Sequence, residues 1–190
     1  MPDARIARFR KRFPERVFAD IGACLRQGQA VGATILMCCA IDIMARYYSG
    51  QPKGRLNRQS YISFMEQYFS KHYDPLQFYQ FVRCGLVHGY DMERKYLILG
   101  SAALWARKLH MAYDPKHKAT IVNPYALYSD VREVFRALVT DLEQSRELRL
   151  RFLKVWKASP FEKQQLSSDK FDHLKAQAHA RKTNKRPIGY

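Results

Sequence analysis

The sequence predicts an all-α fold, an antiparallel helical bundle with one short inserted β-hairpin. Three observations lead to this prediction. Apolar residues recur at helical spacing along most of the chain, turns containing Gly or Pro separate these segments, and only residues 95–122 contain short runs typical of strands. A chain of 190 residues with 47% hydrophobic residues and only 9 Gly is long and apolar enough to bury a core as one domain.

The first three predicted helices span residues 17–27, 30–48 and 59–70. Gly28 is a natural end for the first helix, because glycine readily adopts the left-handed conformation that follows a helix. The second helix is apolar on nearly all sides, which predicts a place at the centre of the bundle, and a turn beginning at Ser49 ends it. Short connections between such helices favour antiparallel packing.

The fourth predicted helix spans residues 75–89. We expect Asp74 to cap it, with Pro75 at the first helical position and Gln77 three residues after the cap. Apolar residues lie on two sides of this helix, whereas a surface helix needs only one apolar side. The first stripe consists of Leu76, Tyr79, Val82 and Leu86, and the second of Phe78 and Phe81. We expect the second stripe to pack against the same helix of a symmetry mate in a homodimer.

The pattern weakens after the fourth helix. Residues 95–99 and 119–122 are typical of short strands that pair with each other, and residues 102–111 between them fit one or two helical turns. A long amphipathic helix is then predicted from Tyr125, and its apolar stripe reaches Leu142. The same periodicity extends to Trp156, so a helix ending near Leu142 and a longer one are both open.

Charge divides the chain into three parts. We expect a basic N-terminal arm over residues 1–16, a helical domain over 17–157 and a basic, partly disordered tail over 158–190. The chain holds 33 Lys and Arg against 17 Asp and Glu, for a net charge of +16. Such a charge attracts polyanions, nucleic acid before anionic membrane, with solubility alone as an equal alternative.

Targeting and metal signals are missing from the sequence. The basic N-terminus lacks the apolar segment of a signal peptide, and the longest apolar stretch, residues 30–45, is interrupted by Asp42. We therefore expect a cytoplasmic protein with no membrane partner. Cysteines at positions 24, 38, 39 and 84 lack the C-x-x-C spacing of a zinc site, and the sequence has no Gly-rich phosphate loop. We expect no metal and no cofactor.

The candidate site lies on the fourth helix, at Arg83 and His88. Five residues of α-helix place these side chains about 140° apart, so they are poor partners on one straight helix. Across a two-fold axis, Arg83 of one chain could approach His88 of another. Asp42 is either a third site residue or a polar group bonded to the backbone or to Arg46, and the sequence favours the second interpretation.

Arg and His without metal ligands suit the cleavage of a phosphodiester in RNA. Histidine titrates near neutral pH and can accept or supply a proton. A guanidinium stays charged and can donate hydrogen bonds to two oxygens of one phosphate at once. The 2′-hydroxyl is the nucleophile, so this chemistry needs RNA. The spacing alone is a weak signal, because a histidine at a helix end is often only a polar cap.

The R-x4-H motif of this helix resembles the signature of the HEPN superfamily (higher eukaryotes and prokaryotes nucleotide-binding). It lies in the run Phe81-Val82-Arg83-Cys84-Gly85-Leu86-Val87-His88. With Gly89-Tyr90 it is also similar to the R-x4-H-x-Y version of HEPN toxins that are paired with minimal nucleotidyltransferase antitoxins. The order of helices over residues 17–156 is similar to that of bacterial HEPN-like proteins.

This resemblance implies that Arg83 and His88 are the catalytic pair of a homodimeric, metal-independent endoribonuclease of toxin type. Tyr90 would occupy the position that the antitoxin enzymes modify with AMP. Many active members carry Asn or Asp directly after the arginine, where this chain has Cys84, and the superfamily includes members that only bind. The alternatives are therefore a non-catalytic HEPN module that binds RNA or protein, and a basic helical adaptor.

Basic side chains outside the motif are expected to contact RNA backbone: Lys53, Arg55 and Arg58 in a loop, and Arg181, Lys182, Lys185 and Arg186 in the tail. We predict that removing residues 181–190 flattens the salt dependence of RNA binding without unfolding the domain. Each lost phosphate contact should lower the slope of log K against log salt by about 0.7 to 0.9. Fluorescence anisotropy at several salt concentrations measures this, and an unchanged slope would leave the tail without a part in binding.

Overall fold

The fold is mainly helical, as predicted, with a small three-stranded sheet at one end. The computed structural model describes residues 3–51 and 58–156. The elements are α1 (Ala4–Phe13), η1 (Pro14–Phe18), α2 (Ala19–Arg26), α3 (Ala30–Ser49), α4 (Arg58–Tyr68), α5 (Pro75–Gln77), η2 (Phe78–Gly89), β1 (Tyr96–Ile98), α6 (Leu104–Lys108), β2 (Tyr113–Asp114), β3 (Ala119–Val122), α7 (Pro124–Gln144) and α8 (Arg146–Trp156).

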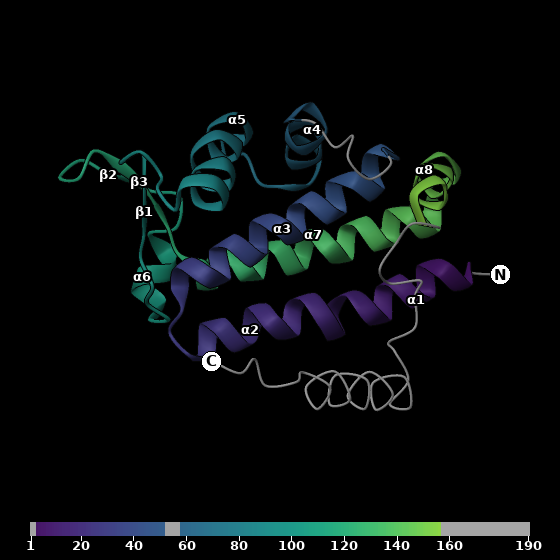
Figure 1. Cartoon of the computed structure of the whole chain (residues 1–190), viewed down its shortest axis with the longest axis horizontal. Helices are drawn as coiled ribbons and strands as arrows, with labels where there is room; N and C mark the ends of the chain where they lie inside the picture. Colours follow the sequence, from purple (N-terminus) through teal and green to yellow (C-terminus); the bar gives the residue numbers. More distant parts are fainter. Residues whose placement is uncertain (1–2, 52–57, 157–190) are drawn as a thin grey trace, which may run out of the picture.

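Helix α3 is the centre of the bundle. It packs against α2, α4, α7, α8 and η2, and Figure 1 shows it alongside α7 with α1 and α2 on one side and α4 and α5 on the other. By length and composition α3 could cross a membrane, but half of its apolar window is buried inside the bundle. Burial among five neighbours explains why its sequence is apolar on nearly all sides.

The N-terminal segment belongs to the core, so the predicted arm over residues 1–16 is wrong. Helix α1 begins at Ala4, and its Ile6, Phe9 and Phe13 are fully buried. Their spacing of three and four residues makes one inward stripe between basic residues that face outward. The π-helix η1 joins α1 to α2 at Pro14, where proline cannot donate the usual backbone hydrogen bond.

Phe9 is the hub of an aromatic cluster that joins the two ends of the described chain. Its ring lies within 4.8 to 6.3 Å of aromatic rings from α1, α3, α7 and α8, measured between centroids. These rings are Phe13, Tyr47, Phe135, Phe152 and Trp156. Most of the pairs meet edge to face, the arrangement that adds to the free energy gained from burial.

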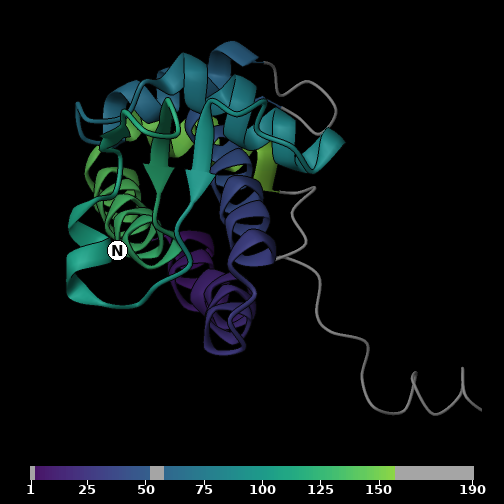
Figure 2. The ribbon, with the colours of Figure 1, turned by 90° about the vertical axis from the view of Figure 1, so that its left-hand side faces the viewer.

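The sheet has the order β1-β3-β2, which corrects the predicted hairpin. Residues 96–98 do pair with 120–122, but the two strands run parallel. The antiparallel partner of β3 is β2, a strand of two residues that was not predicted from the sequence. Figure 2 shows the sheet in front of the ends of the long helices.

Buried polar groups fasten this sheet region to the bundle. His110 accepts a hydrogen bond at Nδ1 from the Asn123 amide, 3.0 Å away, and its Nε2 lies 2.7 Å from the Tyr73 hydroxyl. Tyr73 donates in turn to Asp130 of α7 over 2.6 Å. The chain of bonds connects the loop before α5, the segment before β2 and α7. Trp105 of α6 is 63% exposed.

The C-terminal helical region is interrupted at Ser145. Helical structure does extend to Trp156, as the longer of the two predictions has it, but as two helices and not one. Ser145 has an extended backbone, and its hydroxyl accepts a hydrogen bond from the Leu148 amide, which makes it the cap of α8. Helix α8 then turns back to place Phe152, Val155 and Trp156 in the core.

The helix predicted at residues 75–89 exists, but most of it is π-helical. Phe78, Val82 and Leu86 form a single buried stripe, while Tyr79 and Phe81 pack partly buried against the core. The proposed division into two apolar stripes is therefore wrong, because Phe78 faces the core of its own chain. The homodimer stays a prediction, with less apolar surface available for it than expected.

The end of η2 folds closely onto the segment that follows it. A Cβ atom at Gly85 would lie 2.2 Å from the Asp91 carbonyl oxygen, and the Asp91 amide donates to the Gly85 carbonyl at 3.2 Å. The chain's own backbone therefore fills the space beside Gly85.

We predict that Gly85→Ala lowers the free energy of unfolding by about 1 to 3 kcal/mol, because the added methyl must displace backbone. Gly89→Ala is the matched control. It lies on the same helix with nothing within 4 Å of its added Cβ, and alanine favours helix over glycine by about 1 kcal/mol. Urea unfolding of the three proteins measures both effects. Equal stabilities of the two variants would contradict the close approach.

Candidate functional site

The π-helical geometry of η2 brings Arg83 and His88 together on one chain. In a π-helix each amide bonds to the carbonyl five residues earlier, so residues five apart lie about one turn apart on the same face. Arg83 Nη1 lies 3.1 Å from His88 Nε2. The separation of about 140° expected from α-helical geometry is therefore wrong, and the pair needs no second chain to form.

Asp42 of α3 fixes the guanidinium of Arg83. Its Oδ2 accepts hydrogen bonds from Arg83 Nε at 3.1 Å and Nη2 at 2.9 Å. The favoured interpretation of Asp42, a bond to the backbone or to Arg46, is wrong, and the alternative of a third site residue fits the structure. Both side chains are mostly buried, with 21% of Arg83 and 19% of Asp42 exposed. Hydrogen bonds to a charged group of this kind are the stronger ones in proteins.

Burial and pairing have opposite effects on the two charges. Burial raises the pKa of Asp42, and the hydrogen bond from Arg83 lowers it by less, so the pKa of Asp42 is raised. Burial alone would lower the pKa of Arg83, but its hydrogen bonds to Asp42 raise it. Arg83 is therefore a permanent cation, and Asp42 is a carboxylate that is costly to keep charged.

Tyr79 and Cys84 complete the surroundings of Arg83, and Tyr79 was not among the predicted site residues. The guanidinium carbon lies 5.7 Å from the centre of the Tyr79 ring, a cation–π distance. Burial, followed by a hydrogen bond to Cys84, raises the pKa of Tyr79. Tyr79 precedes Arg83 by four residues, a spacing that places both on one helical face. That spacing was the available signal.

The site opens to solvent at the end of η2. His88 is exposed, and Tyr90 is 69% exposed at the left-handed residue that ends the helix. Among residues 3–51 and 58–156, Tyr90 makes no side-chain hydrogen bond with Arg83 or His88. Any ligand of Arg83 and His88 therefore approaches from the side of His88, since Asp42 and α3 close the other side.

The remaining predicted contacts are not part of this cluster. Arg58 is exposed at the start of α4. Lys53, Arg55 and the four basic residues of the tail between 181 and 186 lie outside the described residues. Within the described part of the chain, no group of three or more His, Cys, Asp and Glu side chains is placed to hold a metal ion.

The hydrogen-bond pattern defines what the site can do chemically. Arginine has no acceptor, so His88 Nε2 accepts from Nη1, and a neutral imidazole then carries its proton on Nδ1. Asp42 occupies the Nε and Nη2 hydrogens that face it. Nη1 faces His88 and Cys84, so a phosphate that displaces these contacts would meet paired donors on the edge formed by Nη1 and Nη2. A fixed cation thus stands beside a group that can take a proton.

Comparison with known proteins adds no relative. No protein-family model matches the chain, and no curated protein or solved structure matches it either. The geometry of the pair, with the motif that carries it, is therefore the basis for a functional proposal.

The raised pKa of Asp42 predicts how stability depends on pH. The folded protein binds this proton more tightly than the unfolded chain does. The contribution of Asp42 to the free energy of unfolding is thus fully present below pH 3.8, the ordinary pKa of an aspartate. It is lost as the pH rises through the raised pKa of the folded protein. We expect the stability of wild type minus that of Asp42→Asn to fall from acid to neutral pH, as measured by urea unfolding. A difference that grows with pH would contradict the raised pKa.

Proposed function

We propose that this chain is a HEPN-type, metal-independent endoribonuclease. The observation that carries the proposal is the contact of 3.1 Å between Arg83 Nη1 and His88 Nε2, with the guanidinium fixed by Asp42. The motif that these residues form resembles the HEPN signature, and the helical bundle is the architecture that this resemblance implies. The net charge of +16 supports a polyanionic substrate.

The proposed reaction is an internal transfer at phosphorus. The 2′-oxygen attacks the adjacent phosphorus, the P–O5′ bond breaks, and the products carry a 2′,3′-cyclic phosphate and a 5′-hydroxyl. A phosphate oxygen draws Arg83 Nη1 away from His88, which frees the Nε2 lone pair to take the 2′-hydroxyl proton. The leaving oxygen receives a proton from water or from a second imidazole in a dimer. Arg83 stabilises the negative charge that develops on the non-bridging oxygens.

Asp42 supports catalysis despite Cys84. Many active HEPN members carry Asn or Asp next to the arginine, and here the thiol of Cys84 lies 3.8 Å from Nη1, a weak contact. The carboxylate of Asp42 reaches the same guanidinium from another helix and accepts two hydrogen bonds from it. We infer that Asp42 is the positioning residue that orients Arg83.

The proposal includes a homodimer, a cytoplasmic location and control by a nucleotidyltransferase-type antitoxin. A dimer would place two Arg83–His88 pairs in one substrate cleft, and the partly buried Tyr79 and Phe81 with the exposed Leu76 offer apolar surface for contact. Tyr90 fits an enzyme that transfers AMP to a hydroxyl, since its side chain is exposed at the end of η2.

The second candidate is a HEPN module that binds RNA or protein without cleaving it. One observation favours it. Arg83 occupies the lone pair of His88 Nε2, so the imidazole cannot act as a base until Arg83 moves. If Arg83 keeps this contact when RNA is bound, the pair is a binding surface only.

We predict that His88→Ala abolishes RNA cleavage, with a loss of about 10² to 10⁴ in rate, the usual contribution of proton transfer. Arg83→Ala should lower the rate by about 10² to 10³, and Arg83→Lys should restore little because an ammonium lacks the paired donors. Gel analysis of a structured RNA in the presence of a chelator measures cleavage, and the products should end in 2′,3′-cyclic phosphate.

The control variant is His72→Ala, which removes an exposed histidine outside the site. Purified in the same way, it should cleave like the wild type. A 2′-deoxy nucleotide at the cleaved step should stop the reaction. Activity that survives His88→Ala, or that requires Mg²⁺, would overturn the mechanism. Intact binding with no cleavage by any of these proteins would favour the binding module.

A further inference from the structure

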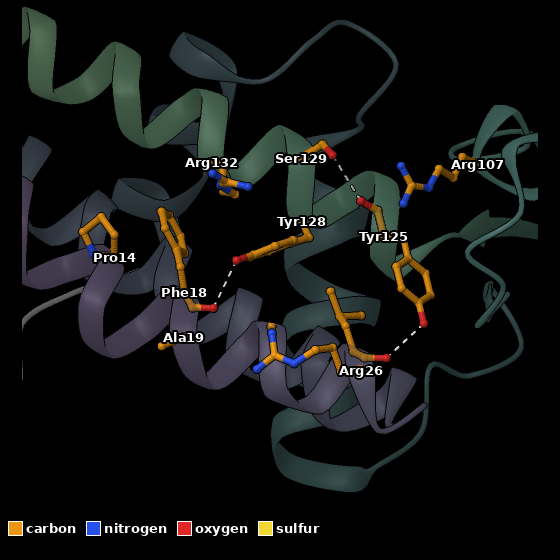
Figure 3. A pocket seen from close by; sticks show the side chains of 11 residues that line it. Pro14, Phe18, Ala19, Arg26, Arg107, Tyr125, Tyr128, Ser129 and Arg132 are labelled. Atoms are coloured by element: carbon orange, nitrogen blue, oxygen red, sulfur yellow. Dashed lines mark hydrogen bonds between the residues drawn. The ribbon is translucent and has the colours of Figure 1, made fainter.

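A basic groove lies between α2 and α7, away from Arg83 and His88. Its wall includes Arg26 of α2, Arg107 of α6, and Tyr125, Tyr128, Ser129 and Arg132 of α7, and its volume is about 800 Å³. Figure 3 shows the three arginines around the two tyrosines. Elements α4 and η2 lie on the opposite side of α3 and α7 (Figure 1), and no residue of η2 lines the groove.

The groove is a concentration of unpaired positive charge. Among the residues that the structure describes, three arginines line it and no Asp or Glu does. All three are exposed. None of them forms a salt bridge with an acidic residue that the structure describes. Other arginines of the chain are paired, as Arg10 is with Glu143 and Arg83 is with Asp42. The three guanidinium groups therefore keep their hydrogen-bond donors for a ligand.

The walls of the groove are fixed by hydrogen bonds and ring contacts. The Tyr128 hydroxyl donates to the Phe18 carbonyl at 3.1 Å, and the Tyr125 hydroxyl donates to the Leu25 carbonyl at 3.0 Å. The guanidinium of Arg132 lies 5.5 Å from the Tyr128 ring, and that of Arg107 lies 5.7 Å from the Tyr125 ring. Two of the three cations are thus held against rings that are bonded to the neighbouring helix.

We propose that this groove binds the phosphates of a single-stranded RNA, as a second binding site separate from Arg83 and His88. A guanidinium matches a phosphate with paired donors, and three of them on three elements suit an anion that repeats along a strand. The groove is large enough for more than one phosphate group. Binding of RNA in this groove requires no chemistry at His88. The proposal therefore applies whether the protein is a nuclease or a binding module.

Ser129 provides a test that changes only the charge of the groove. It is exposed on α7, and its hydroxyl bonds to the Tyr125 carbonyl one turn earlier. Ser129→Glu places a carboxylate among the arginines, and Ser129→Gln places a neutral side chain of the same size there. We expect Ser129→Glu to weaken binding of a fluorescein-labelled oligoribonucleotide about 5-fold near 0.1 M salt, the loss of roughly one phosphate contact. Ser129→Gln should bind like the wild type.

Thr140→Glu and Thr140→Gln are the matched controls for long-range charge. Thr140 is exposed on the same face of α7, about 16 Å further along the helix, and its hydroxyl also bonds to the carbonyl four residues earlier. It does not line the groove. Both Thr140 variants should bind within 2-fold of each other, since most of the effect of an exposed charge is screened beyond about 10 Å.

A double variant tests the arginines themselves. Arg26→Ala with Arg132→Ala should lower the slope of log K against log salt by about 1.4, or roughly 0.7 for each phosphate contact with single-stranded RNA. Arg146→Ala with Lys154→Ala removes the same charge from exposed positions on α8 and should leave most of the slope unchanged. Unfolding midpoints of all variants show whether each one folds.

All binding is measured in an additional His88→Ala background, so that the probe stays intact. The proposed binding site would be overturned if Glu at position 129 and Glu at position 140 weakened RNA binding equally, or if neither weakened it. Displacement of the strand by a mononucleotide or an acidic peptide at equal affinity would overturn the assignment to RNA. Failure of the nuclease proposal is distinguishable, because cleavage would be absent while the Ser129 effect on binding remained.

Discussion

The burial of α3 is the constraint on which the rest of the structure depends. Five elements pack around this helix, and Asp42 on it carries a negative charge into that environment. A buried carboxylate must be hydrogen-bonded, because the free-energy cost of an unpaired one is large. Arg83 meets this requirement from η2. The pairing orients the guanidinium, and the guanidinium in turn lies against His88.

The π-helical hydrogen bonding of η2 determines which residues can act together. It places Arg83 beside His88 and Tyr79 beside Cys84, two pairs with the same spacing of five residues. In an α-helix neither pair would share a face. The widened helix also ends against the Asp91 carbonyl, which approaches so closely that only glycine fits at position 85. Unusual helical geometry of this kind occurs often at functional sites.

Periodicity was sufficient to predict the main helices and the central position of α3, since a buried stripe leaves a regular trace in the sequence. It did not reveal the partner of Asp42, because Arg83 is 41 residues away and no local pattern records such a contact. Helix α1 was missed because its basic residues outnumber the stripe of Ile6, Phe9 and Phe13. Strand direction was wrong because three- and four-residue strands carry too few side chains to specify a partner.

The position of Phe9 has a consequence for how the chain folds. Its contacts with Phe135, Phe152 and Trp156 join residues separated by most of the described sequence. Contacts of high sequence separation slow folding, because a long loop must close before they form. During synthesis, α1 emerges before α7 and α8, so most of the ring contacts of Phe9 cannot form until those two helices have followed. The nascent chain therefore presents the apolar stripe of α1 to solvent, where a chaperone can bind it, until translation of the domain is nearly complete.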